Sequence, residues 1–429
     1  MEQVECIVVG GGLAGLAAAY GLASAGVEVM VLERGDYCGA KNVTGGRLYL
    51  EPVRRFYPEL WDEAPLERPV TRERLTVAGD GAHLTLEVGA ERFGGARPHS
   101  ATVVRARLDQ WLAEKVAEKG GVVVPGMKVD ALLREGGRVV GIRAGGDEIG
   151  AGVVVVAEGV LRLLAAEAGL AAAPQARDHA VGFKEVLELP AGAIEERFGL
   201  EPGEGAAHLF MGSVTRGLPG GGFLYTNHDT VALGVVVGME ALRGRSDGLE
   251  AWQLLEEVRQ QPFLRPLLEG ATLAEYSAHA IAEGGISQVP ALYGDGYLLA
   301  GDTAGLSLNA LLTVRGMDFA LASGYFAAEA VKRARAAGAF TAANLACYEA
   351  MLRESFVLRD LETMRDAPRA LGNGRLFRHY PDAVTRLAAQ LYTVGEGPSP
   401  GLVRTLWRGL RRDFAGLDTL RDLWSLRHI

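Results

Sequence analysis

The sequence predicts an α/β protein in which a domain built on a parallel sheet is interrupted by an antiparallel-sheet domain and followed by helices. Three observations support this fold class. A glycine-rich strand–helix–strand unit opens the chain, an apolar run without alternation recurs at residues 152–157, and longer strands with glycine-rich turns fill residues 180–280. The expected boundaries are 1–72, 100–178 and 281–335 for the first domain, 73–99 and 179–280 for the second, and 336–429 for the helical region.

The opening unit carries glycines at GxGxxG spacing. An apolar run leads into Gly10, Gly12 and Gly15, an Ala-rich segment follows, and a second apolar run ends on Glu33, 18 residues after Gly15. In such a unit the first glycine allows a tight turn, the second lets backbone N–H groups approach a pyrophosphate, and the third lets helix and strand pack closely. The acid can bond ribose hydroxyls, so the unit predicts a Rossmann-like dinucleotide site.

The composition is that of an ordinary globular chain of 429 residues, 48% of them hydrophobic. The 44 basic and 53 acidic side chains give a net charge of −9, so no overall positive field attracts nucleic acid. Cys6, Cys38 and Cys347 form no C-x-x-C pair, which predicts neither a disulfide framework nor a metal or iron–sulfur site. No signal peptide or membrane-spanning run is recognisable, so we expect a cytoplasmic protein with at most peripheral membrane contact.

Two segments after the fingerprint suit a nucleotide ligand. The loop from Arg34 to Tyr49 is rich in Gly, Asn and Thr, which favours a backbone that runs past a flat ligand, although a plain surface loop is the alternative. Arg105 stands just before a helix predicted from the spacing of Leu108, Trp111 and Leu112, where its guanidinium could clamp a pyrophosphate. A solvated arginine at a helix start is the alternative there.

The first domain is expected to resume near residue 296, with a short apolar strand that ends in Gly301-Asp302. Asp302 can accept a hydrogen bond from a ribityl hydroxyl, and the N-terminus of the helix that follows near Arg315 can face the edge of a flavin where negative charge develops. The alternative is an Asp that merely caps a helix. Together with the N-terminal fingerprint, this second segment of the first domain, which carries Gly301-Asp302, indicates that the dinucleotide is FAD.

Near the C-terminus Val403, Trp407 and Leu410 follow helical spacing, and arginines stand beside them. The apolar series continues with Phe414, Leu417 and Leu420, and the arginines are Arg404, Arg408, Arg411 and Arg412. Such a segment can contact an anionic membrane or a partner protein. We expect the commoner outcome, in which its apolar side packs on the core.

The motifs that this chain lacks narrow the range of reactions it could catalyse. The chain has no second GxGxxG module for NAD(P)H, no C-x-x-C, no H-E-x-x-H and no P-loop. A flavin then carries the redox step, while the protein supplies binding, orientation and electrostatics. We therefore predict no catalytic side chain.

Several segments, in this order along roughly the first 330 residues, resemble the FixC-type, electron-transfer-flavoprotein:quinone oxidoreductase family, within the class that includes geranylgeranyl reductases. They are residues 39–49 (Gly-Ala-Lys-Asn-Val-Thr-Gly-Gly-Arg-Leu-Tyr), 105–112, 181–185 (Val-Gly-Phe-Lys-Glu), 195–200, 220–227 (Gly-Gly-Gly-Phe-Leu-Tyr-Thr-Asn), 301–305 and 315–318. Glu158-Gly159 departs from the Asp-Gly that is usual in related flavoproteins.

The resemblance implies an FAD enzyme that passes electrons from an electron-transfer flavoprotein of two subunits to a membrane quinone. Long members carry a 4Fe–4S domain, whereas short FixC-type members use a separate ferredoxin-like subunit, and this cysteine-poor chain fits the short type. A place on the inner face of the cell membrane would follow. The resemblance further places the quinone near Phe223 to Tyr225.

The resemblance also assigns roles to individual residues. The fingerprint glycines would hold the pyrophosphate, Glu33 the adenosine ribose, and Arg105 the FAD phosphate or the ribityl region. Arg34 is a further cofactor-binding residue. The residues implied to line the flavin are Gly45, Gly46, Asp302, Gly316 and Met317.

Three other functions remain compatible with the same motifs. One is a geranylgeranyl reductase, whose members usually carry a Tyr-x-Trp-x-Phe-Pro segment where this chain has Gly-Gly-Phe-Leu-Tyr-Thr-Asn. Another is an aromatic-hydroxylase type of monooxygenase, which would consume oxygen with NADPH. The third is an electron-relay or assembly subunit that is not an enzyme.

Overall fold

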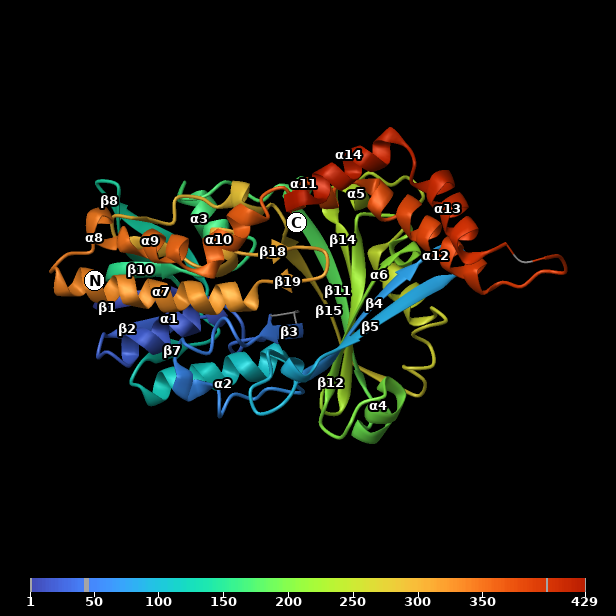
Figure 1. Cartoon of the computed structure of the whole chain (residues 1–429). Coiled ribbons are helices and arrows are strands. Elements are labelled where there is room, and N and C mark those ends of the chain that lie inside the picture. The colour runs from blue at the N-terminus through green and yellow to red at the C-terminus, as the bar shows by residue number, and fades with distance from the viewer. Residues whose placement is uncertain (1, 42–45, 399, 429) are drawn as a thin grey trace.

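The computed structural model describes residues 2–41, 46–398 and 400–428. Gly45, one of the predicted site residues, lies outside these ranges. Figure 1 shows a helix-covered sheet on the left, which contains the N-terminal strand, and a second sheet of long strands on the right, with the last helices above it. The cavity described below lies between these two bodies.

The first sheet has eight strands, and most of its order, β16-β17-β10-β1-β2-β7, runs parallel. An antiparallel pair, β8 and β9, extends β10 at one end, and β16 pairs antiparallel with β17. The strands of this sheet are β1 Glu2–Val9, β2 Val29–Leu32, β7 Val122–Val124, β8 Val129–Glu135, β9 Arg138–Ala144, β10 Asp147–Val156, β16 Tyr293–Gly294 and β17 Tyr297–Leu299.

The prediction that the apolar run at 152–157 continues the opening sheet is confirmed. Strand β10 lies parallel to β1, with Val4 opposite Ala151 and Val9 opposite Val156. Such a run needs no alternation because both faces of the strand are covered, and residues 153–156 have no exposed surface.

The second sheet has seven strands in the order β15-β11-β14-β13-β12-β4-β5. Strands β4 and β5 form an antiparallel hairpin joined by residues 79–82. One pair departs from the predicted antiparallel pattern, because β4 runs parallel to β12. These two strands come from distant parts of the chain, so no hairpin turn fixes their relative direction. The strands are β4 Val70–Ala78, β5 His83–Gly89, β11 His179–Glu188, β12 Gly205–Gly212, β13 Gly220–Thr226, β14 Thr230–Gly238 and β15 Thr272–Ala282.

Two further two-stranded sheets flank the cavity region. Strands β3 (Gly46–Tyr49) and β6 (Ser100–Val103) form one, and β18 (Leu308–Asn309) and β19 (Val314–Arg315) form the other. Both are short, and Figure 1 places them where the two large sheets meet.

The helices divide between the two large sheets. Helices α1, α2 and α7 to α10 contribute to the core around the first sheet, α6 packs on β11 and β14, and α12 packs on β4 and β5. Their bounds are α1 Leu13–Ala23, α2 Arg105–Glu118, α3 Leu163–Glu167, α4 Ala191–Phe198, α5 Met239–Arg243, α6 Ala251–Arg259, α7 Met317–Ala336, α8 Ala342–Leu345, α9 Cys347–Glu354, α10 Phe356–Thr363, α11 Ala367–Leu371, α12 His379–Tyr392, α13 Leu402–Asp413 and α14 Leu417–Ser425.

A buried arginine ties the chain to the second sheet where it first crosses over. The guanidinium of Arg68, just before β4, donates to the carbonyl oxygens of Asn227 (2.6 Å), His228 (2.9 Å) and Glu204 (2.8 Å), and to the Glu195 carboxylate (2.9 Å). An Arg presents several donors in a fixed fork, so one side chain satisfies three loop carbonyls at once. This ties the start of β4 to α4, to the loop before β12 and to the loop between β13 and β14.

The expectation for the C-terminal segment is wrong. It forms two helices, α13 and α14, and their apolar side chains face outward, with Val403 78%, Trp407 66% and Leu417 75% exposed. Helix α13 instead packs through Gly409, which lies against Leu387 of α12. A small residue permits this close approach, and helical periodicity alone does not say which face a neighbour covers.

Candidate functional site

The predicted glycines build a tight turn between β1 and α1. Gly10 has φ +105°, and a Cβ there would lie 2.2 Å from the carbonyl oxygen of Ala157, just after the neighbouring strand β10. A Cβ at Gly15 would lie 2.0 Å from the carbonyl oxygen of Gly10, so helix and strand pack as closely as the motif predicts. Gly12 caps α1 without a side-chain hydrogen bond, which leaves the N–H groups of the first turn available to a phosphate.

Glu33 holds this turn in place. Its carboxylate accepts hydrogen bonds from the backbone N–H of Gly11 (2.8 Å) and of Gly35 (2.6 Å), and thereby joins the glycine turn to the end of β2. Both Glu33 and the exposed Arg34 line the cavity. A carboxylate oxygen has more than one lone pair, so these two bonds leave Glu33 able to accept from a ribose hydroxyl as well.

Arg105 lies beside the glycine turn. The guanidinium makes a bidentate ion pair with Asp109 at 2.7 Å through both Nε and Nη2, and Asp109 has no exposed surface. The Nη2 atom lies 3.8 Å from the position that a Cβ at Gly12 would take. The structure therefore brings Arg105, from a separate element, to the place where a pyrophosphate would lie on α1.

Asp302 faces the same cavity from the turn after β17. Burial raises the pKa of this carboxyl, and the positive charges of Arg105 and Arg162 counteract the rise. Arg162 was not among the predicted residues. It is buried with φ +37° and donates to the carbonyl oxygen of Gln288 (3.1 Å). Its place close to Asp302 depends on a left-handed backbone that the sequence around it does not signal.

At the other end of the cavity three elements meet around Gly46 of β3. A Cβ at Gly46 would lie 3.8 Å from Cε2 of Tyr225 and 3.9 Å from Cε of Met317, the first residue of α7. Gly316 caps this helix of 20 residues, and a Cβ there would meet nothing within 4 Å. A flat ring can thus approach the N-terminus of α7, where partial positive charge favours an anionic ring edge.

The structure explains why Glu158 stands where related flavoproteins usually have Asp. Its carboxylate accepts from the backbone N–H groups of Leu164 (2.9 Å) and Ala165 (2.8 Å), at the N-terminus of α3. The longer side chain is what lets it reach across the turn to this helix. Burial raises the pKa of Glu158, and the backbone bonds counteract this.

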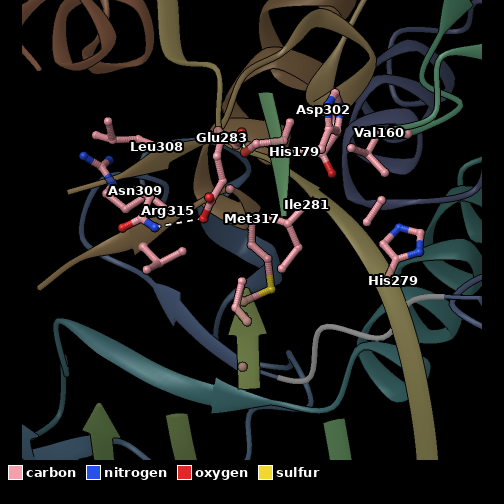
Figure 2. Close-up of a pocket in the computed structure, with 18 of the residues that line it drawn as sticks. Val160, His179, His279, Ile281, Glu283, Asp302, Leu308, Asn309, Arg315 and Met317 are labelled. Carbon is pink, nitrogen blue, oxygen red and sulfur yellow. Dashed lines mark hydrogen bonds between the residues drawn. The ribbon is translucent and has the colours of Figure 1, made fainter. Parts of the chain in front are cut away.

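The described site residues converge on one cavity of about 620 Å³. Of the ten predicted site residues that the structure describes, nine line it, and Gly15 lies beneath it in the α1–β1 contact. Figure 2 shows residues that sequence reasoning missed, including His179 and His279 from strands β11 and β15 and Glu283 just after β15. The pairing of β11 with β15 brings them to the cavity, and no local motif marks them.

The cavity fits FAD in its chemistry. It offers an open glycine turn at a helix N-terminus, an arginine beside it, an acid near the middle and an apolar, open end around Gly46 and Met317. No group of three metal-ligating side chains occurs among residues 2–41, 46–398 and 400–428. A Rossmann-like nucleotide site covered by a second sheet, with this lining, defines the class of flavin-dependent oxidoreductases.

Comparison with known proteins specifies this class further. Residues 8–51 match the model of the NAD(P)-binding Rossmann-like domain family. The chain is 41% identical over 421 residues to YdiS of Escherichia coli strain K12, named a probable electron transfer flavoprotein-quinone oxidoreductase, with 98% of this chain and 97% of YdiS covered. It is 43% identical over 402 residues to protein FixC of the same strain, with 93% and 92% covered.

Solved structures show the same fold at low identity. A geranylgeranyl bacteriochlorophyll reductase-like protein from Thermoplasma acidophilum superimposes with a TM-score of 0.73 at 17% identity, covering 99% of this chain and all of that one. The myxobacterial halogenase CndH gives a TM-score of 0.66 at 20% identity, covering 96% of this chain and 97% of that one.

The chain belongs to the family of FixC and electron transfer flavoprotein-quinone oxidoreductases. It is an FAD-dependent oxidoreductase that works in electron transfer. Among the residues that the structure describes, no helix is both long and apolar enough to cross a membrane.

Proposed function

We propose that this chain takes electrons from an electron-transfer flavoprotein of two subunits and passes them, through bound FAD, to a membrane quinone. The observation that carries the proposal is the continuous cavity that joins the glycine turn at Gly10 to the second sheet at Phe223 and Tyr225. One continuous space can hold the dinucleotide along the first sheet and a second ring against its flavin end. The names of the relatives support the choice of donor and acceptor.

The proposed role of each residue follows from its place in or beside the wall of the cavity. Gly10, Gly12 and Arg105 bind the pyrophosphate, and Gly15 lets α1 reach it. Glu33 and Arg34 hold the adenosine end, and Asp302 accepts from the ribityl chain. Gly46, Gly316 and Met317 line the flavin ring, which supplies the redox chemistry when bound. The proposed FAD domain comprises residues 1–72, 100–178 and 281–335, and the second sheet of the 73–99 and 179–280 segments covers it.

The quinone is proposed to lie against β13. Phe223 and Tyr225 stack on one another with ring centroids 5.1 Å apart, and Tyr225 is next to Gly46 and Met317. Residues 220–222 on the same strand are glycines that line the cavity, so a planar ring can approach the backbone closely there. Burial raises the pKa of the Tyr225 hydroxyl, which therefore stays a neutral hydrogen-bond donor.

A membrane-facing surface is proposed at the C-terminus, on the inner side of the cell membrane. We name it the α13–α14 surface; its exposed apolar residues are Leu402, Val403, Trp407, Leu410, Leu417, Leu420, Leu423 and Trp424. Exposed arginines, among them Arg404 and Arg408, can pair with anionic headgroups while the apolar side chains enter the lipid. Helix α14 packs on α11, whose Leu371 lines the cavity, so a lipid-soluble quinone would have a short route from the membrane.

A separate ferredoxin-like 4Fe–4S subunit completes the proposed assembly, because the three cysteines of this chain are too few for such a cluster. Purification of the native complex with a flavin and iron count tests the partners. Two electron-transfer-flavoprotein chains and one iron–sulfur chain are expected; a chain purified alone from its native source would contradict the assembly.

The function itself is tested by adding reduced electron-transfer flavoprotein and the ferredoxin-like subunit to the purified chain, with a short-chain quinone as acceptor. The expected result is a flavin absorbance that bleaches with the donor and returns with the quinone, together with quinol formation. A protein without flavin absorbance, or one whose flavin the donor does not reduce, would overturn the proposal.

A further inference from the structure

A titratable group that the proposed function does not use lies on the second-sheet side of the cavity. Glu283 follows β15, and its backbone N–H donates to the carbonyl oxygen of Asp178 (2.9 Å), just before β11. The side-chain Oε1 accepts from Nδ2 of Asn309 in β18 (2.9 Å). Figure 2 shows this bond, with Ile281 and Met317 projecting into the same space.

The surroundings of Glu283 favour a neutral carboxyl. Burial raises the pKa of Glu283, and the amide of Asn309 opposes the rise. The charged or titratable groups that line the cavity together with Glu283 include Arg177, Asp178 and His179 before and at the start of β11, Glu240 on α5, His279 on β15, Asp302 in the turn after β17, and Arg315 on β19.

Two of the nearby cations are engaged elsewhere. The Arg315 guanidinium pairs with Asp318 and with Asp360, and Arg177 lies 3.7 Å from the Asp178 carboxylate. Over residues 2–41, 46–398 and 400–428, no basic side chain forms an ion pair with Glu283 within 4.0 Å. Burial without a cationic partner favours the protonated form of a carboxyl that faces a cavity.

We propose that Glu283 is the proton donor to the quinone, an inference that rests on the proposed function and deepens it. Reduction of a quinone to a quinol consumes two electrons and two protons. The electrons arrive by the route proposed above. The O–H bond of Glu283 breaks as an O–H bond forms on one quinone oxygen, and the carboxylate left behind keeps the hydrogen bond from Asn309. Solvent at the cavity mouth supplies the second proton and reprotonates Glu283.

The central test is Glu283→Gln. The glutamine oxygen can still accept a hydrogen bond from Asn309, so the fold and the contact with the β18–β19 pair should persist. The glutamine side chain cannot release a proton. Flavin content and the rate of flavin reduction by the donor should stay at the wild-type level, while the rate of quinone reduction falls on the order of 100-fold. An unchanged quinone rate would overturn the inference.

The pH dependence gives a second measure. In the wild type the quinone rate should fall as pH rises through the raised pKa of Glu283, because only the protonated acid donates. Asn309→Ser removes the amide donor that stabilises the carboxylate, so the falling limb should move to higher pH. The limb should be absent in Glu283→Gln. A limb that persists in Glu283→Gln would assign the titration to another group and overturn the inference.

Infrared difference spectroscopy provides a readout independent of turnover. A protonated carboxylic acid band should respond to quinone addition in the wild type and be absent in Glu283→Gln. The matched control is Glu185→Gln. Glu185 is a buried glutamate of β11 that does not line the cavity, whose pKa burial also raises, and whose carboxylate lies 3.4 Å from Arg259 of α6.

The control variant should keep both the wild-type band and the wild-type quinone rate. A quinone-responsive band that survives in Glu283→Gln would count against the inference. If the wild-type protein itself fails to reduce a quinone, the proposed function fails. If the wild-type protein reduces a quinone and Glu283→Gln does so at the same rate, the proposed function stands and only the role of Glu283 as proton donor fails.

Discussion

Gly324 of α7 lies directly against the backbone of Ala14 in α1, since a Cβ at Gly324 would lie 2.2 Å from the carbonyl oxygen of Ala14. This contact joins the two helices whose N-termini face the cavity. Ala14 also touches Gly301, where a Cβ would lie 2.8 Å from the Ala14 Cβ. The glycine turn and the turn that carries Asp302 are therefore held against one another by small residues.

Gly324→Ala should force α1 and α7 apart. A backbone oxygen cannot move aside as a flexible side chain can, so we expect a loss of about 1–3 kcal/mol in the free energy of unfolding. Flavin affinity should fall as well. Urea denaturation and flavin titration measure the two effects. The control is Gly192→Ala in α4, where a Cβ meets nothing within 4 Å and the substitution should stabilise slightly. Equal stability of the two variants would contradict the close contact.

A double substitution separates the role of Arg105 in FAD binding from its ion pair with Asp109. Arg105→Leu alone leaves the fully buried Asp109 without its bidentate partner and should cost about 3–5 kcal/mol of stability. Adding Asp109→Leu removes the buried carboxylate as well and should restore most of that stability. FAD affinity should nevertheless remain reduced by tenfold or more, because the phosphate loses its guanidinium. A stable double variant that binds FAD like wild type would exclude Arg105 from the site.

His208 makes stability depend on pH. Burial, followed by the charge of Arg74, lowers the pKa of His208 from 6.5 to about 4, and its Nε2 shares a hydrogen bond with Thr76 (2.7 Å). Below about pH 6.5 the unfolded chain binds a proton that the folded chain does not accept until about pH 4. Stability should therefore fall by about 3 kcal/mol as pH drops through this window.

The check is the slope of unfolding free energy against pH for the wild type and for His208→Asn. The asparagine cannot titrate, so its slope between these pH values should be shallower. Parallel curves for the two proteins would show that His208 is not responsible.

The α13–α14 surface can be tested with anionic lipid vesicles. Replacing Trp407 and Trp424 together by Ser should weaken vesicle binding by tenfold or more, since both rings are more than half exposed. High salt should weaken binding of the wild type through its arginines. The control is Trp252→Ser on α6, an exposed tryptophan outside this surface. Equal vesicle binding by all three proteins would contradict a membrane-facing role.

Much of the nucleotide site is local and so is readable in the sequence. The turn at Gly10, the close packing at Gly15 and the strand before Asp302 each depend on residues within a few positions of one another. Their spacing reports backbone constraints directly, because glycine adopts a φ near +105° without strain and alone has no Cβ to block so close an approach. The parallel position of β10 followed from an equally local signal, the absence of alternation.

Other features depended on which distant elements meet. Arg162 close to Asp302, Tyr225 beside Gly46, and Glu283 joined to Asn309 each bring together segments that have no pattern in common. The bonds of Glu33 to Gly11 and Gly35 likewise gave the acid a structural role that its motif does not state.

By itself the sequence determined a dinucleotide-binding α/β protein, its flavin and its family, because those depend on short-range backbone rules and on the order of motifs. Only the tertiary structure decided which side chains face the cavity from the second sheet, and that the last two helices turn their apolar faces outward. Periodicity specifies that a helix has an apolar face, but burial is a property of two surfaces, and the second surface is fixed by packing across the whole chain.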